Sequence, residues 1–292
     1  MSDYYAGVNF TKKIHSDTYP YISSIAAPTS YNGKVIFITG ASRGIGRAAA
    51  LSYARSGAGG LALAARTSSA LASLETEINS ISPCTKTLKL VVDVTDAAAV
   101  DAAVKHLWTE FERLDVVINN AGFYEPMANI SASSFDCWWK SMTVNLKGPY
   151  LITRACLPYL TQSQPGGQIV NVSSVGAHRL IKGISAYSTA KFALLRFTEF
   201  TQAEYNDKGV IAIAVHPGAV ATEMGLQNPK SIHHKLAGDT ISWLTRERRE
   251  WLGGRYLSVT WDMEEVERRK AEIGKGAALK MRMVIDENFC NP

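Results

Sequence analysis

Tyr187 and Lys191 stand four residues apart in a segment with the pattern of a helix, so both side chains lie on one helical face, one turn apart. A phenol that exchanges a proton near neutral pH needs a pKa well below its ordinary value of about 10. An adjacent ammonium group favours the phenolate and lowers the pKa of the phenol. The pair is therefore a candidate acid/base unit, although the same spacing also occurs on partly solvated helix faces that do no chemistry.

A glycine-rich turn, residues 39–46 with the sequence TGASRGIG, lies between a strand-like run and a helical segment. Gly40 allows a tight turn, Gly44 lets the backbone approach a pyrophosphate, and Gly46 permits close helix packing. The helix that follows offers oriented N–H groups to negative charge. Such a turn can be an ordinary loop, but a strand before it and a helix after it favour nucleotide binding.

The segments that must hold these groups alternate between short apolar runs and helical stretches. Short, nearly continuous apolar strands between helices predict a parallel sheet covered on both faces, which is a doubly wound α/β fold of the Rossmann type. The candidate strands are 35–38, 61–65, 88–92, 116–118, 169–172, 211–215 and 256–259, and the helices between the first of them are 45–55, 71–81, 97–111 and 135–144.

The amino-acid composition excludes several classes of protein. The chain has 292 residues, 46% of them apolar and 20% charged, which excludes a disordered chain or a disulfide scaffold. The net charge of +5 is spread along the chain rather than concentrated, so we expect no nucleic-acid partner.

The cysteines and the N-terminus bear on location. Four cysteines, at positions 84, 137, 156 and 290, are widely spaced and lack a zinc-binding pattern, so we expect free thiols, a reducing compartment and no metal. The first residues lack the apolar core of a signal peptide, and no run of roughly 18 apolar residues could cross a bilayer. We therefore expect a cytoplasmic protein without a membrane partner.

The glycine spacing, together with Tyr187 and Lys191, resembles the short-chain dehydrogenase/reductase family, whose motifs have the forms TGxxxGxG and YxxxK. Further motifs of that family follow in its order: residues 119–122 (NNAG) after the fourth strand, Ser174 before the tyrosine, and Pro217-Gly218 with Thr222 after the sixth strand. Asn145 stands where the family has its catalytic asparagine. The resemblance covers about residues 33–261 and implies a nicotinamide cofactor.

The resemblance also implies which residues hold that cofactor. Asp93 matches the position whose carboxylate, with the backbone after it, contacts adenine. The expected cofactor-binding residues are Gly40, Ser42, Arg43, Gly44, Ile45, Gly46, Arg66, Asp93, Val94, Asn120, Ala121, Gly122, Tyr187, Lys191, Pro217, Gly218, Val220 and Thr222.

The end of the second strand indicates which nicotinamide cofactor is used. An acid there would bind a ribose 2′-hydroxyl and repel a 2′-phosphate, but Ala65 takes that position and Arg66 follows. Arg43 in the glycine turn adds a second guanidinium, a group that binds phosphate bidentately. The sequence therefore predicts NADP(H); the alternative is that Arg66 is only a solvated surface residue.

The family's chemistry assigns a role to each candidate catalytic residue. Tyr187 is the general acid in carbonyl reduction and the general base in alcohol oxidation, and Ser174 donates a hydrogen bond to the substrate oxygen. Lys191, together with the charge of the oxidised nicotinamide, lowers the pKa of Tyr187, and it also holds the nicotinamide ribose. Asn145 holds a water that links Lys191 to solvent. Taken alone, Ser174 could instead cap a backbone group, a role for which Ser173 is the better candidate, and Asn145 could bond to backbone inside a helix.

The segment after Pro217-Gly218 forms a lid in this family, here about residues 219–255. Its apolar residues could cover a bulky hydrophobic substrate or simply pack on the domain, and His178 is a further candidate for substrate contact. The C-terminal sequence resembles fungal members that act on polyketide or terpenoid intermediates. The apolar lid candidates are Met224, Leu226, Leu236, Ile241, Trp243, Leu244 and Trp251.

The sequence thus predicts an N-terminal extension (1–30) that packs on the body or on a neighbouring subunit, one domain (31–262) and a helical tail (263–292). The first hypothesis for function is an NADP(H)-dependent enzyme that interconverts a ketone and a secondary alcohol, as a homodimer or homotetramer. The second is a protein that keeps the fold and the nucleotide but acts as a non-redox scaffold or cyclase.

Overall fold

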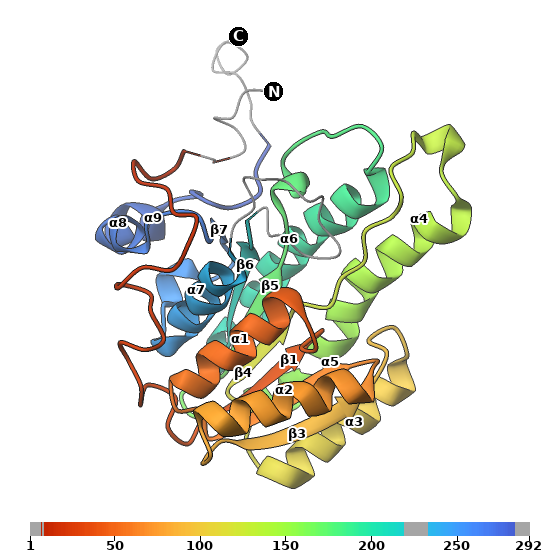
Figure 1. Cartoon of the computed structure of the whole chain (residues 1–292). Helices are drawn as coiled ribbons and strands as arrows, with labels where there is room; N and C mark the ends of the chain where they lie inside the picture. The colour runs from red at the N-terminus through yellow and green to blue at the C-terminus, as the bar shows by residue number, and fades with distance from the viewer. Residues whose placement is uncertain (1–6, 8, 219–232, 284–292) are drawn as a thin grey trace.

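The computed structural model describes residue 7, residues 9–218 and residues 233–283 (Figure 1). A seven-stranded parallel sheet with strand order β3-β2-β1-β4-β5-β6-β7 forms its centre. The order reverses between β1 and β4, which opens a crevice at the carboxyl ends of the strands. The predicted fold class is confirmed. The strands are β1 (Val35–Thr39), β2 (Gly60–Ala65), β3 (Lys86–Val91), β4 (Val116–Asn119), β5 (Gln168–Val172), β6 (Ile211–His216) and β7 (Tyr256–Ser258).

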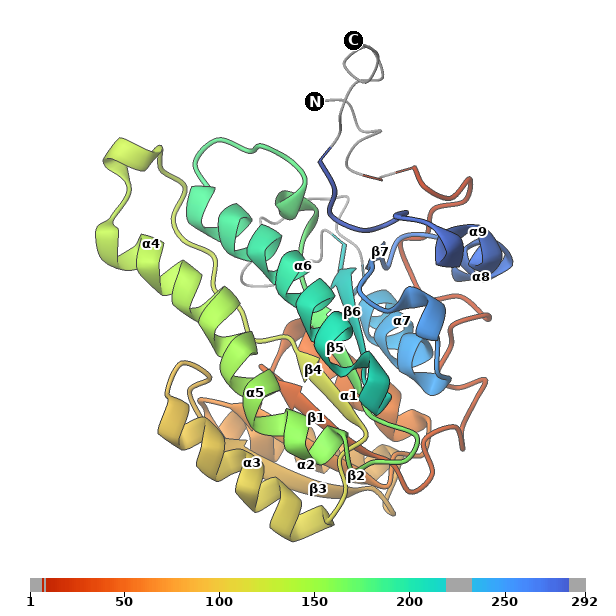
Figure 2. The same cartoon turned by 180° about the vertical axis from the view of Figure 1, so that it is seen from behind.

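Helices cover both faces of this sheet. In Figure 1, α1 (Gly44–Arg55), α2 (Ser68–Ile81) and α7 (His234–Arg246) lie in front of the sheet. In Figure 2, α3 (Ala97–Phe111), α5 (Gly148–Leu160) and α6 (Ser185–Tyr205) cover the other face. Each layer encloses its own apolar core, as the nearly continuous apolar strands require. The remaining helices are α4 (Phe135–Met142), α8 (Met263–Arg268), α9 (Lys270–Lys275) and the short turns η1 (Ile130–Ala132), η3 (Val175–Ala177), η4 (Asn206–Lys208) and η5 (Glu250–Leu252).

The helix predicted over residues 135–144 is longer than expected. It continues from α4 through a π-helical turn, η2 (Thr143–Lys147), into α5. Pro149 follows this turn and has no N–H for the carbonyl four residues back, that of Asn145. The N–H of Gly148 bonds instead to Thr143, five residues back, so the wide turn lets the helix pass the proline.

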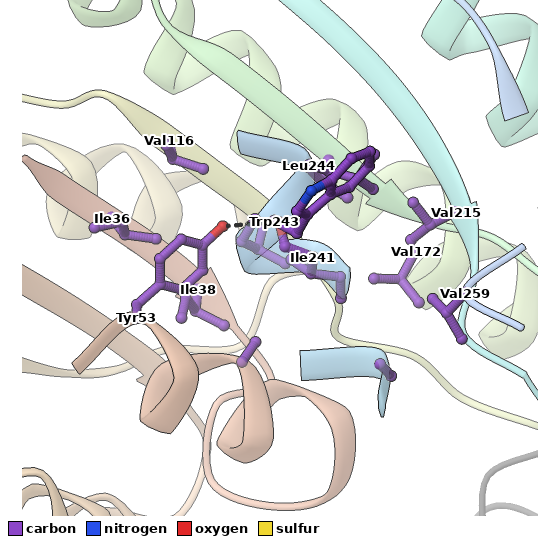
Figure 3. Packing of buried hydrophobic residues seen from close by; sticks show 14 of the residues in the cluster. Ile36, Ile38, Tyr53, Val116, Val172, Val215, Ile241, Trp243, Leu244 and Val259 are labelled. Carbon is purple, nitrogen blue, oxygen red and sulfur yellow. Dashed lines mark hydrogen bonds between the residues drawn. The ribbon is translucent and has the colours of Figure 1, made fainter. Parts of the chain in front are cut away.

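The prediction that the α7 segment contributes to a substrate lid is wrong for its apolar side chains. Leu236, Ile241 and Leu244 are fully buried, and Trp243 is nearly so, in the core between α7, α1 and the sheet (Figure 3). A Cβ atom on Gly238 would stand 2.6 Å from the backbone carbon of Ala48, so the two helices meet at backbone distance. The alternative interpretation, packing on the domain, is what the structure shows. Met224 and Leu226 lie outside the described residues.

The described part of the N-terminal extension packs on the domain. Ile22 is fully buried, and the Thr18 hydroxyl donates to the Asp239 carboxylate on α7 at 2.5 Å. Ile14 pairs with Trp261 in an antiparallel bridge just after β7. On the other side the backbone N–H of Tyr256 donates to the Leu279 carbonyl at 2.8 Å. The edge strand β7 is therefore flanked by both terminal segments.

Two further sequence expectations concern cysteines and membranes. Cys84, Cys137 and Cys156 are free thiols. Within the ranges that the structure describes, none of the helices is both long and apolar enough to pass through a membrane.

Candidate active site

The carboxyl ends of β5 and the start of α6 bring the predicted catalytic residues together. Ser174 follows β5 and begins the η3 turn, where its Oγ accepts from the Gly176 N–H at 3.0 Å. Tyr187 lies in the first turn of α6 and is hydrogen-bonded to the Ser174 side chain. The two hydroxyls that the chemistry requires are thus in direct contact, because β5 ends where α6 starts.

Lys191 lies one turn further along α6 and is almost completely buried. Its Nζ donates to the Val172 carbonyl at 2.7 Å and lies 5.7 Å from the centre of the Tyr187 ring. The Ser173 hydroxyl donates to the Lys191 carbonyl at 3.0 Å and ties the strand end to the helix, so both Ser173 and Ser174 bond to backbone groups. Burial lowers the pKa of Lys191 to about 7, because an ammonium is costly away from water.

The expectation that Lys191 lowers the pKa of Tyr187 does not hold for the protein alone. Burial raises the pKa of Tyr187 above its ordinary value, and the hydrogen bond from Ser174 opposes that rise without cancelling it. The neighbouring Tyr124 and Glu125 raise this pKa further. The physical reason is that the same burial that surrounds the phenol also favours the uncharged form of Lys191, which removes much of the positive charge from the pair.

Glu125 is a buried carboxylate of this site that the sequence analysis missed. One oxygen accepts from the Tyr187 backbone N–H at 2.9 Å and the other from the Ser141 hydroxyl at 2.7 Å. The first N–H groups of a helix lack partners within the helix, and the helix dipole favours an anion there. Glu125 therefore anchors the start of α6. The available signal was a single acid between the NNAG motif and α4, in the run Phe123-Tyr124-Glu125.

Asn145 lies in the π-helical turn, and its side chain makes no hydrogen bond to Lys191. Its amide nitrogen donates to the Phe123 carbonyl at 2.6 Å and to the Ser141 carbonyl at 2.9 Å, while its oxygen accepts from the Phe123 N–H at 3.2 Å. The side-chain amide of Asn145 is therefore bonded to backbone, and the expectation that Asn145 holds a water for Lys191 stays a prediction. Through Ser141 and Glu125 the amide belongs to the network that supports Tyr187.

The glycine turn has the backbone that its sequence predicts. Gly40 and Gly44 both have positive φ, 63° and 54°. A Cβ on Gly46 would lie 2.3 Å from the Gly40 carbonyl oxygen, so only glycine fits. Arg43 is the N-cap of α1 but gives no side-chain cap, and the first turn contains no acid. The helix N-terminus therefore presents N–H groups to an anion, which fits the pyrophosphate of a dinucleotide.

The NNAG motif supports this turn from β4. The Asn120 amide donates to the carbonyls of Thr39 and Gly40 at 2.9 and 3.1 Å, and the Thr39 hydroxyl accepts from the N–H groups of Asn120 and Ala121. The amide nitrogen of Asn120 is therefore bonded to the glycine turn and holds its backbone in place. Ala121 and Gly122 line the same edge of the sheet.

The predicted adenosine-end residues lie at the ends of β2 and β3. Arg66 is exposed directly after Ala65, and its charge lowers the pKa of Asp93. A larger contribution to this lowering comes from the Thr95 N–H, which donates to Asp93 Oδ1 at 2.9 Å. Arg66 and Asp93 thus follow two adjacent parallel strands at the same edge of the sheet.

Of the seven other residues predicted to hold the cofactor, the structure describes five. Val94 is buried, whereas Ser42 and Ile45 in the glycine turn are half-buried, and Pro217 and Gly218 end the described stretch after β6. Val220 and Thr222 lie outside the described residues.

The two histidines near the site differ in their surroundings. His216 Nδ1 accepts from the Val175 N–H at 3.2 Å, and burial, followed by the nearby charges of His178 and Arg179, lowers its pKa to about 3. His178 packs edge-on against Tyr256, with ring centres 4.5 Å apart. In the part of the chain that the structure describes, no group of three or more His, Cys, Asp or Glu side chains could hold a metal.

Comparison with known proteins decides the family. The short chain dehydrogenase family profile matches residues 34–232. The chain belongs to the short-chain dehydrogenase family. The short chain dehydrogenase mpl6 of Monascus purpureus is 44% identical over 96% of this chain and 98% of its own length. The short chain dehydrogenase pigC of Monascus ruber is 42% identical over 94% and 93%.

Solved structures agree with this assignment. Levodione reductase is 26% identical, with a TM-score of 0.74 over 79% of this chain and 97% of its own. A short chain dehydrogenase of Shigella flexneri 2a in complex with NADP is 25% identical, also with a TM-score of 0.74, over 80% and 99%. This short-chain dehydrogenase is therefore an oxidoreductase that uses a nicotinamide cofactor.

Replacing Glu125 tests the anchor at the start of α6. Glu125→Ala leaves the Tyr187 N–H and the Ser141 hydroxyl without their acceptor, which should lower the free energy of unfolding by about 1–3 kcal/mol. Glu125→Gln keeps one acceptor oxygen and should recover part of the loss. Urea unfolding measures both variants, with Glu204→Ala as an exposed-carboxylate control that should unfold like the wild type. An alanine variant as stable as the wild type would contradict the anchoring role.

The low pKa of Lys191 predicts a pH-dependent stability. Between about pH 7 and pH 10 the unfolded chain keeps the lysine protonated while the folded protein does not, so the unfolded state binds more protons and stability rises with pH. Lys191→Met removes this contribution. The difference in unfolding free energy between wild type and variant, measured by urea unfolding at several pH values, should therefore shift in favour of the wild type from pH 7 to pH 10. A constant difference would show that the buried amine titrates at its ordinary pKa.

Proposed function

We propose that this short-chain dehydrogenase uses NADP(H) to interconvert a ketone and a secondary alcohol on a bulky, largely hydrophobic small molecule. The observation that carries the proposal is the contact of the Ser174 and Tyr187 side chains one helical turn from a buried amine with a pKa of about 7. This arrangement can polarise a carbonyl oxygen and exchange one proton with it. The alternative of a non-redox scaffold or cyclase leaves the juxtaposition of these three groups without a purpose.

The proton steps follow from the side chains. In reduction, the Tyr187 hydroxyl gives its proton to the carbonyl oxygen while Ser174 donates a hydrogen bond to the same atom, and in oxidation Tyr187 takes the proton back. The nicotinamide, when bound, supplies or accepts the hydride and, in its oxidised form, adds a positive charge. The raised pKa of Tyr187 keeps the phenol protonated and therefore ready to donate. Lys191, with a pKa near 7, can replace the proton that Tyr187 gives up.

The preference for NADP(H) rests on the cations at the end of β2. Arg66 is exposed beside the Asp93 carboxylate, no acid follows β2, and the exposed Arg43 stands at the start of α1. A guanidinium here favours a 2′-phosphate over a 2′-hydroxyl. The Shigella relative in complex with NADP supports this choice.

The remaining parts of the proposal concern substrate and setting. The fungal origin of the Monascus relatives supports a polyketide or terpenoid intermediate as substrate. We expect the enzyme in the cytoplasm, without a nucleic-acid or membrane partner, as a homodimer or homotetramer. Large exposed aromatic side chains on α4 and α6 support self-association, because monomers rarely expose such groups together. They are Phe135, Trp139, Phe192 and Phe200.

Tyr187→Phe tests the tyrosine mechanism. The variant keeps the ring but lacks the exchangeable proton, so kcat/KM should fall by about 10²–10⁴-fold while NADPH affinity stays near that of the wild type. Turnover is followed by NADPH absorbance with a panel of ketones and secondary alcohols. Tyr124→Phe is the matched control, since its ring lies edge-on 5.0 Å from that of Tyr187 and should tolerate the change. Full activity of Tyr187→Phe would contradict the mechanism in which Tyr187 exchanges a proton with the substrate.

Arg66→Gln tests the cofactor preference. Losing one charge-assisted phosphate contact should raise the Kd of NADPH about 10–100-fold and leave that of NADH unchanged. Arg154→Gln removes an exposed arginine on α5 and should change neither value. Equal kcat/KM of the wild type with both cofactors, or an equal loss with both in the variant, would refute the assignment.

A further inference from the structure

A cavity of about 1230 Å³ lies beside the active site, outside the crevice where the cofactor is expected. The outer face of α6, the η3 turn, β7 and the two terminal segments enclose it. Figure 2 shows the C-terminal segment passing between β7 and α6, where the Met281 N–H donates to Glu199 at 2.9 Å. The apolar part of its wall includes Phe10, Leu195, Tyr256, Trp261, Leu279 and Met281.

The wall of the cavity separates it from the catalytic hydroxyls. Gly176 lines the cavity, and a Cβ built on it would lie 3.3 Å from Ser174 Oγ and 3.7 Å from the Tyr187 ring, although neither of these residues lines the cavity itself. The α6 residues in its wall include Ser188, one position after Tyr187, and lie on a different helical face from Tyr187. The cavity is therefore a second compartment behind the catalytic turn.

Polar atoms in this wall are buried without a partner. Ser188 Oγ, His178 Nε2 and Arg255 Nε have no hydrogen-bond partner, and all three residues line the cavity. Arg255 is also nearly completely buried. A buried polar group without a partner costs free energy, and folded proteins satisfy nearly all of them. These three atoms have almost no accessible surface, so a ligand in the cavity would meet them only after the wall shifts.

The wall of the cavity carries more positively than negatively charged side chains. Among the described residues, Glu199 is the carboxylate of its wall, and it pairs with Arg282 at 3.2 Å. Arg255 donates only to backbone carbonyls, those of residues 253, 273, 274 and 276. Neither Arg255 nor Lys280 has a carboxylate within 4.0 Å in the described part of the chain. Burial lowers the pKa values of Arg255 and Lys280, and repulsion from Arg282 lowers them further, so an anion beside Lys280 would oppose this repulsion.

We propose that this cavity is a binding site, distinct from the hydride-transfer site, for an apolar molecule that carries a carboxylate. The apolar body packs against the aromatic wall formed by Phe10, Tyr256 and Trp261, and the carboxylate pairs with Lys280. A carboxylate offers acceptor oxygens to the Lys280 ammonium, and a hydrogen bond between two charged groups is stronger than one between neutral groups. The proposal does not depend on which carbonyl compound the active site reduces, because the two compartments share only the wall at Gly176.

Isothermal titration calorimetry with two probes of equal shape tests the proposal. The probes are 2-naphthoate and its neutral analogue 2-naphthamide, titrated into the full chain saturated with NADP⁺. The carboxylate should bind at least about tenfold more tightly than the amide, because it gains a charge-assisted contact. Lys280→Gln should abolish this difference by weakening only naphthoate. Lys208→Gln, a matched loss of charge on η4 away from the cavity, should leave both affinities unchanged.

A further variant separates this site from its alternatives. Tyr187→Phe should leave naphthoate affinity unchanged, whereas a loss would place the probe in the hydride-transfer site and overturn the proposal without touching the proposed function. Equal binding of the two probes, or an effect of Lys280→Gln on subunit association rather than on naphthoate, would also overturn the proposal.

Discussion

The burial of the Lys191 amine is the constraint on which the arrangement of the site depends. An amine in this position needs an acceptor, and the Val172 carbonyl at the end of β5 provides it at 2.7 Å. The Ser173 hydroxyl bonds back to the Lys191 carbonyl, so the strand end and the helix are tied at two points. Once α6 is fixed in this way, Tyr187 one turn earlier must lie over Ser174. The catalytic contact is thus a consequence of how a buried lysine is accommodated.

The start of α6 is fixed independently by Glu125. The carboxylate bonds to the Tyr187 N–H and to Ser141 on α4, and Asn145 in the π-helical turn holds both Ser141 and the Phe123 backbone. This network orients Tyr187 from the side opposite Lys191, but it also adds negative charge that raises the pKa of the phenol. Positioning and proton affinity are therefore coupled: the groups that hold Tyr187 in place keep it protonated.

Features that neighbouring residues determine could be predicted from the sequence, whereas features that depend on contacts between distant residues could not. The strands and the turn at Gly40, Gly44 and Gly46 were predictable because apolar periodicity and glycine conformation are local. The position of α7 was not, because an amphipathic helix has the same pattern whether it covers a ligand or packs on α1. The pKa of Tyr187 depends on burial and on Glu125, which lies 62 positions away in the chain. The role of Asn145 depends on a wide helical turn that no local pattern indicated.

The two compartments of the protein come from different parts of the chain. Ser174, Tyr187 and Lys191 lie within residues 34–232, the stretch that defines the family. Much of the second cavity is built outside that stretch, from Phe10, residues 254–256, Trp261 and residues 278–282.

The known proteins differ in how much of the terminal segments they match. The solved structures cover 79–80% of the chain, whereas the Monascus relatives match 94–96% of it. Because the terminal segments both flank the β7 edge and line the cavity, they add a compartment without altering the sheet that positions the catalytic residues. Hydride transfer can then stay constant in this family while the segments beyond its common core vary in the ligands they hold.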